Sequence, residues 1–106
     1  MTDELRITDE PGASRYEARV GTELAGWVDY RRIGRGERRR IVAIHTEVKP
    51  EFGGRGIGSR LVRHVLADAR RNHERVSPMC PLFVAHFERH PDDADLLAPG
   101  RLPTPR

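Results

Sequence analysis

The stretch "HTEVKPEFGGRGIGSRLV", residues 45–62, carries the strongest structural signal in the sequence. An alternating apolar run stops at Pro50, four glycines follow between positions 53 and 58, and a helical pattern then begins. The first turn of a helix leaves backbone N–H groups unpaired, so a strand that passes through glycines into a helix is typical of an anion-binding site. We therefore expect a phosphate group at this loop, with a plain flexible turn as the alternative.

The spacing of these glycines differs from that of two common phosphate-binding motifs. A P-loop needs a Gly-Lys-Ser/Thr ending, which is absent, and the glycines do not form a convincing dinucleotide fingerprint. Without a Cβ, the glycines let the backbone approach an anion closely. Arg55 and Arg60 could add charge-assisted hydrogen bonds.

Periodicity predicts an α+β domain in the element order β-β-β-α-β-α. Residues 15–20, 24–33 and 39–48 alternate as half-buried strands do and suggest an antiparallel meander. Apolar residues from Ile57 recur at helical spacing and predict a helix that ends near Asn72 or His73. A short strand is expected within 75–83, parallel to 39–48, followed by a helix over 81–90 and a last helical turn.

Composition limits the classes of protein to consider. The 106 residues suit one domain, expected over 1–97, and the proline-rich segment 98–106 is expected to be disordered. No apolar run approaches the length of a membrane span, and the acidic N-terminus lacks the features of a secretory signal, so we expect a cytoplasmic protein. The net charge is only +3, and arginines alternate with acids along most of the chain. Nucleic acid is therefore not expected as a partner.

The segment "GGRGIGSRLV" resembles the pyrophosphate-binding motif of the GCN5-related N-acetyltransferases, Arg/Gln-x-x-Gly-x-Gly/Ala, with Gly56 and Gly58 on its two small positions. Four further segments are similar to the short branch of that family, and they occur in order from about Asp29 to Leu97. They are "DYRR", "IHTEVKPEF", "PMCPL" and "ERHPDDADLL". Two departures stand out. The first motif position is Gly53 instead of Arg or Gln, and the helix over 82–90 carries no tyrosine to serve as the usual acid.

The resemblance implies a reduced family fold with a mixed antiparallel and parallel sheet. It also implies an acetyl-CoA-dependent N-acetyltransferase, whose partners are an acyl-CoA and an amine acceptor. In the family, backbone N–H groups of the central strand polarise the thioester carbonyl, which is the logic of an oxyanion hole. The implied cofactor-binding residues are Glu47, Val48, Gly53, Gly54, Arg55, Gly56, Ile57, Gly58 and Ser59.

Two side chains are candidates for catalysis. His45 precedes the loop, and an imidazole can deprotonate an incoming amine. Cys80 is the only cysteine, which excludes an internal disulfide. Its thiol could accept the acetyl group or protonate the departing coenzyme A. The alternatives are a hydrogen-bonded strand histidine and a buried hydrophobic cysteine. No histidine has partners at a recognisable metal spacing, so no metal site is predicted.

The sequence is compatible with three functions. An N-acetyltransferase is favoured, and a non-catalytic coenzyme A or acyl-CoA-binding module is the alternative, since the sequence lacks the N-terminal helices that usually wall the acceptor site. A nucleic-acid-binding protein is the weakest of the three, because no basic run is interleaved with aromatic residues.

Overall fold

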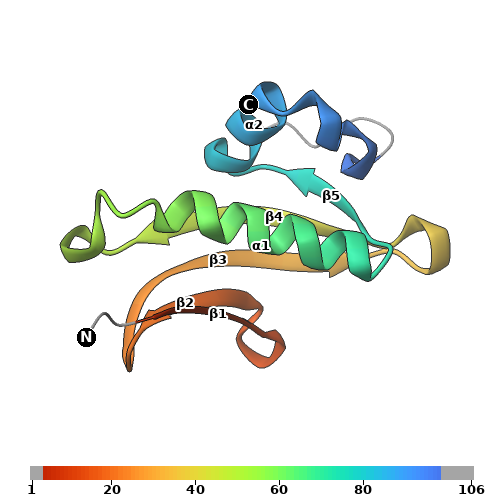
Figure 1. Cartoon of the computed structure of the whole chain (residues 1–106). Helices are drawn as coiled ribbons and strands as arrows, with labels where there is room; N and C mark the ends of the chain where they lie inside the picture. The colour runs from red at the N-terminus through yellow and green to blue at the C-terminus, as the bar shows by residue number, and fades with distance from the viewer. Residues whose placement is uncertain (1–3, 99–106) are drawn as a thin grey trace.

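One five-stranded sheet with the strand order β1-β2-β3-β4-β5 organises the chain in the computed structural model, which describes residues 4–98 (Figure 1). Within these residues, two α-helices, a C-terminal 3-10 segment and short 3-10 turns accompany the sheet. The strands are β1 Leu5–Glu10, β2 Arg15–Val20, β3 Glu23–Ile33, β4 Arg40–Val48 and β5 Arg75–Pro78; the helices are α1 Ile57–Arg71 and α2 Pro81–Arg89; and the 3-10 segments include η2 Gly36–Arg38, η3 Pro50–Phe52 and η4 Pro91–Leu96.

The α+β class with a mixed sheet is confirmed, and the expected element order lacks one strand. Strands β2, β3 and β4 pair antiparallel, and β4 pairs parallel with β5 across the α1 crossover, as predicted. The additional strand is β1, which pairs antiparallel with β2. Leu5 and Ile7 alternate with polar residues in this strand and pack against the core. The prediction for 98–106 falls almost entirely outside the described residues.

A β-bulge changes the direction of side chains along β4. Asp29 lies opposite His45 and Tyr30 lies opposite Ala43, so Ile44 is an extra residue on β4. A bulge of this kind shifts the phase of the alternation. Before the bulge, Ile41 and Ala43 face the core, and after it Thr46 and Val48 lie on that side.

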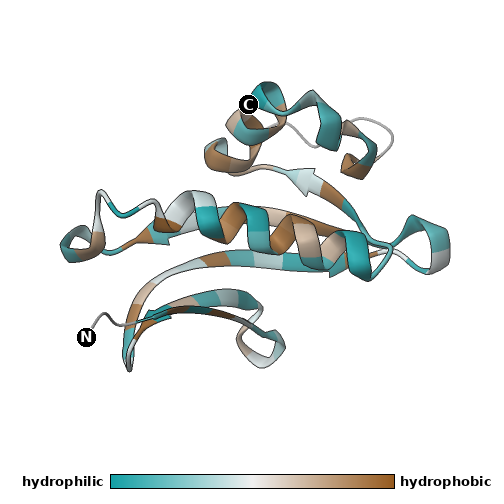
Figure 2. Cartoon of the chain, in the orientation of Figure 1, coloured by the Kyte–Doolittle hydropathy of each residue, from teal (hydrophilic) through white to brown (hydrophobic). Residues whose placement is uncertain are grey.

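Helix α1 buries its apolar stripe against the sheet. Figure 2 shows apolar and polar bands alternating along this helix in front of β3 and β4. The buried positions recur every three or four residues, which places them on one face. Burying these aliphatic side chains supplies the main stabilisation, at roughly 25 cal/mol per Å² of apolar surface. They are Ile57, Leu61, Val62, Val65, Leu66 and Ala69.

A polar network ties the edge of the sheet to the C-terminal end of α1. Arg32 donates hydrogen bonds to Glu74 at 2.9 Å, to the Tyr30 hydroxyl at 2.9 Å and to Asp9 at 3.2 Å. Burial, together with the hydrogen bond to Asp9, raises the pKa of Tyr30 to about 12. Glu74 is only 7% exposed, so its charge requires the guanidinium beside it.

The segment after α2 covers the outer edge of β5. Leu97 forms a parallel bridge with Val76, and the Ala98 N–H donates to the Val76 carbonyl at 2.9 Å. An unpaired strand edge is thereby closed. In the part of the chain that the structure describes, no helix is both long and apolar enough to cross a membrane.

Candidate functional site

The C-terminal ends of β4 and β5 diverge. Pairing between the two strands stops at Ala43 and Pro78, whereas β4 continues to Val48. The N–H groups of Met79 and Cys80 both donate to the Ala43 carbonyl, at 2.9 and 3.1 Å, and the chain then turns into α2. Within residues 4–98, the backbone edge of β4 beyond Ala43 therefore has no strand partner on the β5 side. Such an edge leaves peptide groups available for a ligand.

Cys80 lies buried at this divergence. Its side chain is 2% exposed, and its sulfur lies 3.2 Å from the Thr46 hydroxyl, to which the thiol donates. Its backbone carbonyl accepts the first N–H groups of α2, from Phe83 and Val84. The cysteine therefore joins the end of β4 to the start of α2, and Thr46 is a site residue that sequence analysis missed. The bulge at Ile44 turns Thr46 inward, and local alternation gives no signal for that change.

His45 lies on the opposite face of β4 from Thr46. One ring nitrogen of His45 lies 2.8 Å from a Glu47 carboxylate oxygen, and the two side chains are 56% and 46% exposed. Asp29 and Trp27 on β3 lie directly opposite His45 and Glu47. The structure therefore brings His45 together with Glu47, and it does not bring His45 into contact with Cys80.

An aromatic and ionic cluster borders His45 on the same face of the sheet. Glu17, directly opposite Trp27, accepts hydrogen bonds from Arg15 at 2.7 Å and Arg19 at 3.0 Å, and Arg15 also lies over the Trp27 ring. Burial acts to raise the pKa of Glu17, but the hydrogen bonds from the two arginines outweigh burial and hold the pKa below its usual value. Glu17 is therefore an ionised structural group.

The glycine loop joins η3 to the N-terminus of α1. Gly56 is the N-cap residue of α1, with φ +73°, and no side chain of residues 4–98 caps this end of the helix. A Cβ built at Gly54 or Gly56 would meet nothing within 4 Å, so the loop faces open space. Open space beside an uncapped helix N-terminus suits a negatively charged group.

The other residues predicted to bind the cofactor differ in their surroundings. Arg55 is exposed and lies over the Phe52 ring, Ile57 is buried in the core, and Ser59 is exposed. A Cβ at Gly58 would lie 2.8 Å from Leu82 Cδ2, which is the end of an exposed and flexible side chain of α2. Val48 is half-buried against the core, and Gly53 is exposed with an extended backbone.

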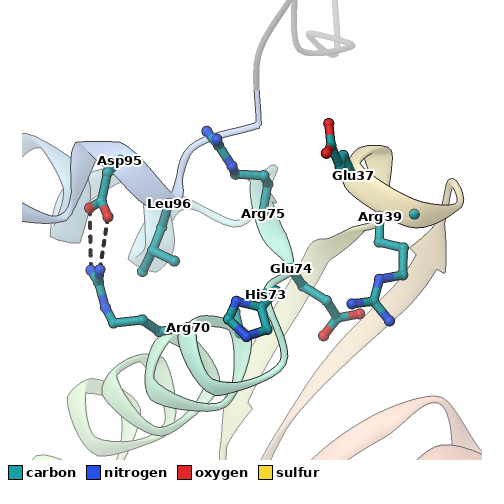
Figure 3. A pocket seen from close by; sticks show the side chains of 10 residues that line it. Glu37, Arg39, Arg70, His73, Glu74, Arg75, Asp95 and Leu96 are labelled. Atoms are coloured by element: carbon teal, nitrogen blue, oxygen red, sulfur yellow. Dashed lines mark hydrogen bonds and ion pairs between the residues drawn. The ribbon is translucent and has the colours of Figure 1, made fainter.

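A cavity of about 660 Å³ lies at the C-terminal end of α1, away from the glycine loop (Figure 3). Arg70 pairs with Asp95 across its rim, at 2.8 Å, as the dashed lines in Figure 3 show. Arg39 donates to the Asn72 carbonyl and Glu74 binds Arg32, so most charges around this cavity already have partners. Among residues 4–98, no three His, Cys, Asp or Glu side chains come together as metal ligands.

The parallel pair β4 and β5 thus diverges on the same sheet whose strand β4 leads through the glycine loop into α1. The family model described as GCN5-related N-acetyl-transferase matches residues 15–96. The chain therefore belongs to the GCN5-related N-acetyltransferase family.

Two solved structures support this fold. A GCN5-like protein from Staphylococcus aureus is similar with a TM-score of 0.64 and 22% identity, over 92% of this chain and 91% of that one. A GCN5-related N-acetyltransferase from Kribbella flavida has a TM-score of 0.53 and 22% identity, over 81% of this chain and 33% of that one. The chain thus spans about a third of the length of the second protein. Among curated proteins, none matches this chain.

Proposed function

We propose that this protein is an acetyl-CoA-dependent N-acetyltransferase that acts on an amine. The observation that carries the proposal is the N-terminus of α1 at Gly56, which has no side-chain cap among the described residues and follows the part of β4 that extends beyond its pairing with β5. The N–H groups of the first helical turn, together with loop residues 53–59, would hold the cofactor's pyrophosphate. Family membership supports this assignment.

The free edge of β4 would hold the remainder of the cofactor. Backbone groups near Glu47 and Val48 would pair with its amide-containing arm, as another strand would. Acetyl-CoA supplies an acetyl group activated as a thioester. An N–H group of β4 directed at the thioester carbonyl oxygen would stabilise negative charge there, in a site from which water is partly excluded.

His45 would act as the general base for the amine. Its imidazole is accessible, and its hydrogen bond to Glu47 holds the ring in one orientation. A neutral imidazole nitrogen can accept a proton from an ammonium directly or through one water molecule. Asp29, on the adjacent strand, would keep that amine near the ring by charge attraction.

Cys80 would act at the divergence, on the core side of β4. Its thiol can donate a proton to the departing sulfur of coenzyme A, or its sulfur can take up the acetyl group. Its 2% exposure and its hydrogen bond to Thr46 favour the role of proton donor. The competing explanation is that Cys80 only packs as a small buried hydrophobic residue.

Calorimetric titration with acetyl-CoA tests the cofactor site. We expect Gly56→Glu to abolish binding, because it places a carboxylate where the pyrophosphate would lie. Gly56→Ala is the matched control, since it adds a Cβ at the same positive φ without a charge. Equal affinity of Gly56→Glu and the parent protein would remove this loop as the cofactor site.

Intact-mass measurement on the same samples separates the two chemical roles of Cys80. An added acetyl group that is lost in Cys80→Ala would make Cys80 an acyl acceptor. Acetylation of an amine by the parent protein without such an adduct would favour the proton-donor role.

A non-catalytic acyl-CoA-binding module is the second candidate. The observation that favours it is that, within residues 4–48, strands β1 to β4 follow one another through short turns and 3-10 segments, with no α-helix that could wall an acceptor site. Tight binding of acetyl-CoA with no transfer to a broad panel of primary amines would support this module.

A further inference from the structure

The hairpin between β3 and β4 concentrates positive charge at one end of the sheet. Six of the ten residues 31–40 are arginines and one, Glu37, is acidic. Arg32 is paired with Asp9 and Glu74, and Arg39 donates to a carbonyl. Within residues 4–98 the other four make no ion pair or side-chain hydrogen bond. These four are Arg31, Arg35, Arg38 and Arg40.

Three arginines converge on a cavity of about 360 Å³ beside this hairpin, which we term the hairpin cavity. Arg38 comes from η2, Arg40 from the start of β4 and Arg75 from the start of β5, and Ile33 and Glu37 also line the cavity. Arg40 and Arg75 are direct partners in the parallel register. Like charges placed opposite each other destabilise a sheet unless an anion lies between them.

The backbone around the hairpin cavity is held in place. Gly34 has φ +86°, and a Cβ at this position would collide with the Arg38 carbonyl oxygen, so the turn requires glycine. The Arg75 N–H donates to the Arg39 carbonyl at 3.1 Å, and one Arg75 side-chain nitrogen donates to the Leu97 carbonyl at 3.3 Å. The arginines therefore extend from a fixed frame, which reduces the entropy cost of binding a ligand.

We propose that the hairpin cavity binds a phosphate-bearing ligand. Three guanidinium groups against one carboxylate, Glu37, leave a net positive charge, and a phosphate has enough oxygens to accept hydrogen bonds from all three arginines. The cavity volume lies at the lower end of the range for small-molecule sites, about 300–1,000 Å³. It suits one phosphate group and a small portion of the molecule attached to it, with Ile33 as the apolar contact.

The hairpin cavity is separate from the glycine loop. Arg40 begins β4 and Val48 ends it, so the two sites lie at opposite ends of a strand that spans roughly 25 Å. The run Arg38–Arg40 is therefore too far from the α1 N-terminus to contact a phosphate adjoining a pyrophosphate held there. The proposal does not depend on acetyl-CoA binding.

Titration of the full chain with inorganic phosphate, followed by amide NMR shifts, tests the proposal. We expect saturable shifts at Gly34, Arg40 and Arg75, and an increase in melting temperature with phosphate. The double variant Arg40→Gln/Arg75→Gln should weaken phosphate binding at these amides at least tenfold. The matched control Arg63→Gln/Arg89→Gln changes one arginine of α1 and one of α2, both outside the hairpin cavity and the glycine loop, and should leave this binding unchanged.

A 12-base-pair DNA duplex serves as a second probe and identifies the source of the phosphate. If the duplex competes with inorganic phosphate and binds more weakly to Arg40→Gln/Arg75→Gln, the phosphate-bearing ligand of the hairpin cavity is a nucleic acid. Phosphate binding without duplex binding would indicate a small phosphorylated molecule. Shifts confined to residues 53–59, or equal losses in the variant and the control, would overturn the proposal, since either result assigns no site to the hairpin cavity.

Discussion

The Cys80 thiol donates a hydrogen bond to the Thr46 hydroxyl across 3.2 Å, although 34 residues separate the two in the chain. This contact joins the divergent end of β4 to the first turn of α2. It also places the only sulfur that could take part in acyl transfer beside the free edge of β4. A change at Cys80 can therefore affect both stability and acyl transfer, so the two effects must be measured separately.

Cys80→Ala should lower the free energy of unfolding by about 1–2 kcal/mol, because it leaves a small cavity and removes a hydrogen bond. Thr46→Val, which keeps the shape but removes the acceptor, should cost about 1 kcal/mol. Chemical denaturation of both single variants and the double variant measures their coupling. Strictly additive effects would show that the hydrogen bond contributes nothing to stability.

His45→Gln should lower kcat by roughly 10²–10⁴-fold if the imidazole is the general base. The affinity for acetyl-CoA should not change, because His45 lies on the opposite face of β4 from Cys80 and Thr46. Glu47→Gln should have a smaller effect, since the amide keeps a hydrogen-bonding group beside the ring and removes only the carboxylate charge. Steady-state kinetics across pH check this, and an unchanged profile in His45→Gln would exclude the role.

Gly58→Ala should leave stability unchanged or raise it by up to about 1 kcal/mol, because alanine is the better helix former. The added Cβ would meet the end of the Leu82 side chain, which is 41% exposed and free to rotate away. If a ligand also approaches this position closely, acetyl-CoA affinity should fall despite the preserved stability. Thermal unfolding and calorimetry of the same variant measure both quantities, with Leu82→Ala as the packing control.

His64 should make stability depend on pH near neutrality. Burial, together with the positive charge of Arg71, lowers the pKa of His64 in the folded protein. The unfolded chain therefore binds a proton more readily, so stability is fully present above about pH 6.5 and declines as pH falls towards the lower folded pKa. His64→Phe, which keeps a ring beside Tyr16, should reduce this decline. An unchanged pH dependence of unfolding in His64→Phe would contradict the assignment.

The sequence by itself determined the elements whose signals are local. The alternation in 39–48, the glycines at 53–58 and the helical spacing after Ile57 specify strand, loop and helix, because these patterns follow from backbone periods of 2 and 3.6 residues. The mixed sheet and its parallel pair also followed, since a strand-helix-strand crossover has one favoured arrangement. Strand β1 was missed although Leu5 and Ile7 alternate with polar residues, because the segment is short and highly charged.

Only the tertiary structure decided which side chains share a site. The bulge at Ile44 depends on the register with β3, so no local pattern could place Thr46 towards Cys80 or His45 towards Asp29. The pairing of Arg40 with Arg75 likewise depends on two strands that are 35 positions apart in sequence. Periodicity reports which face a residue occupies within its own element, whereas the register between elements arises only when the whole core packs.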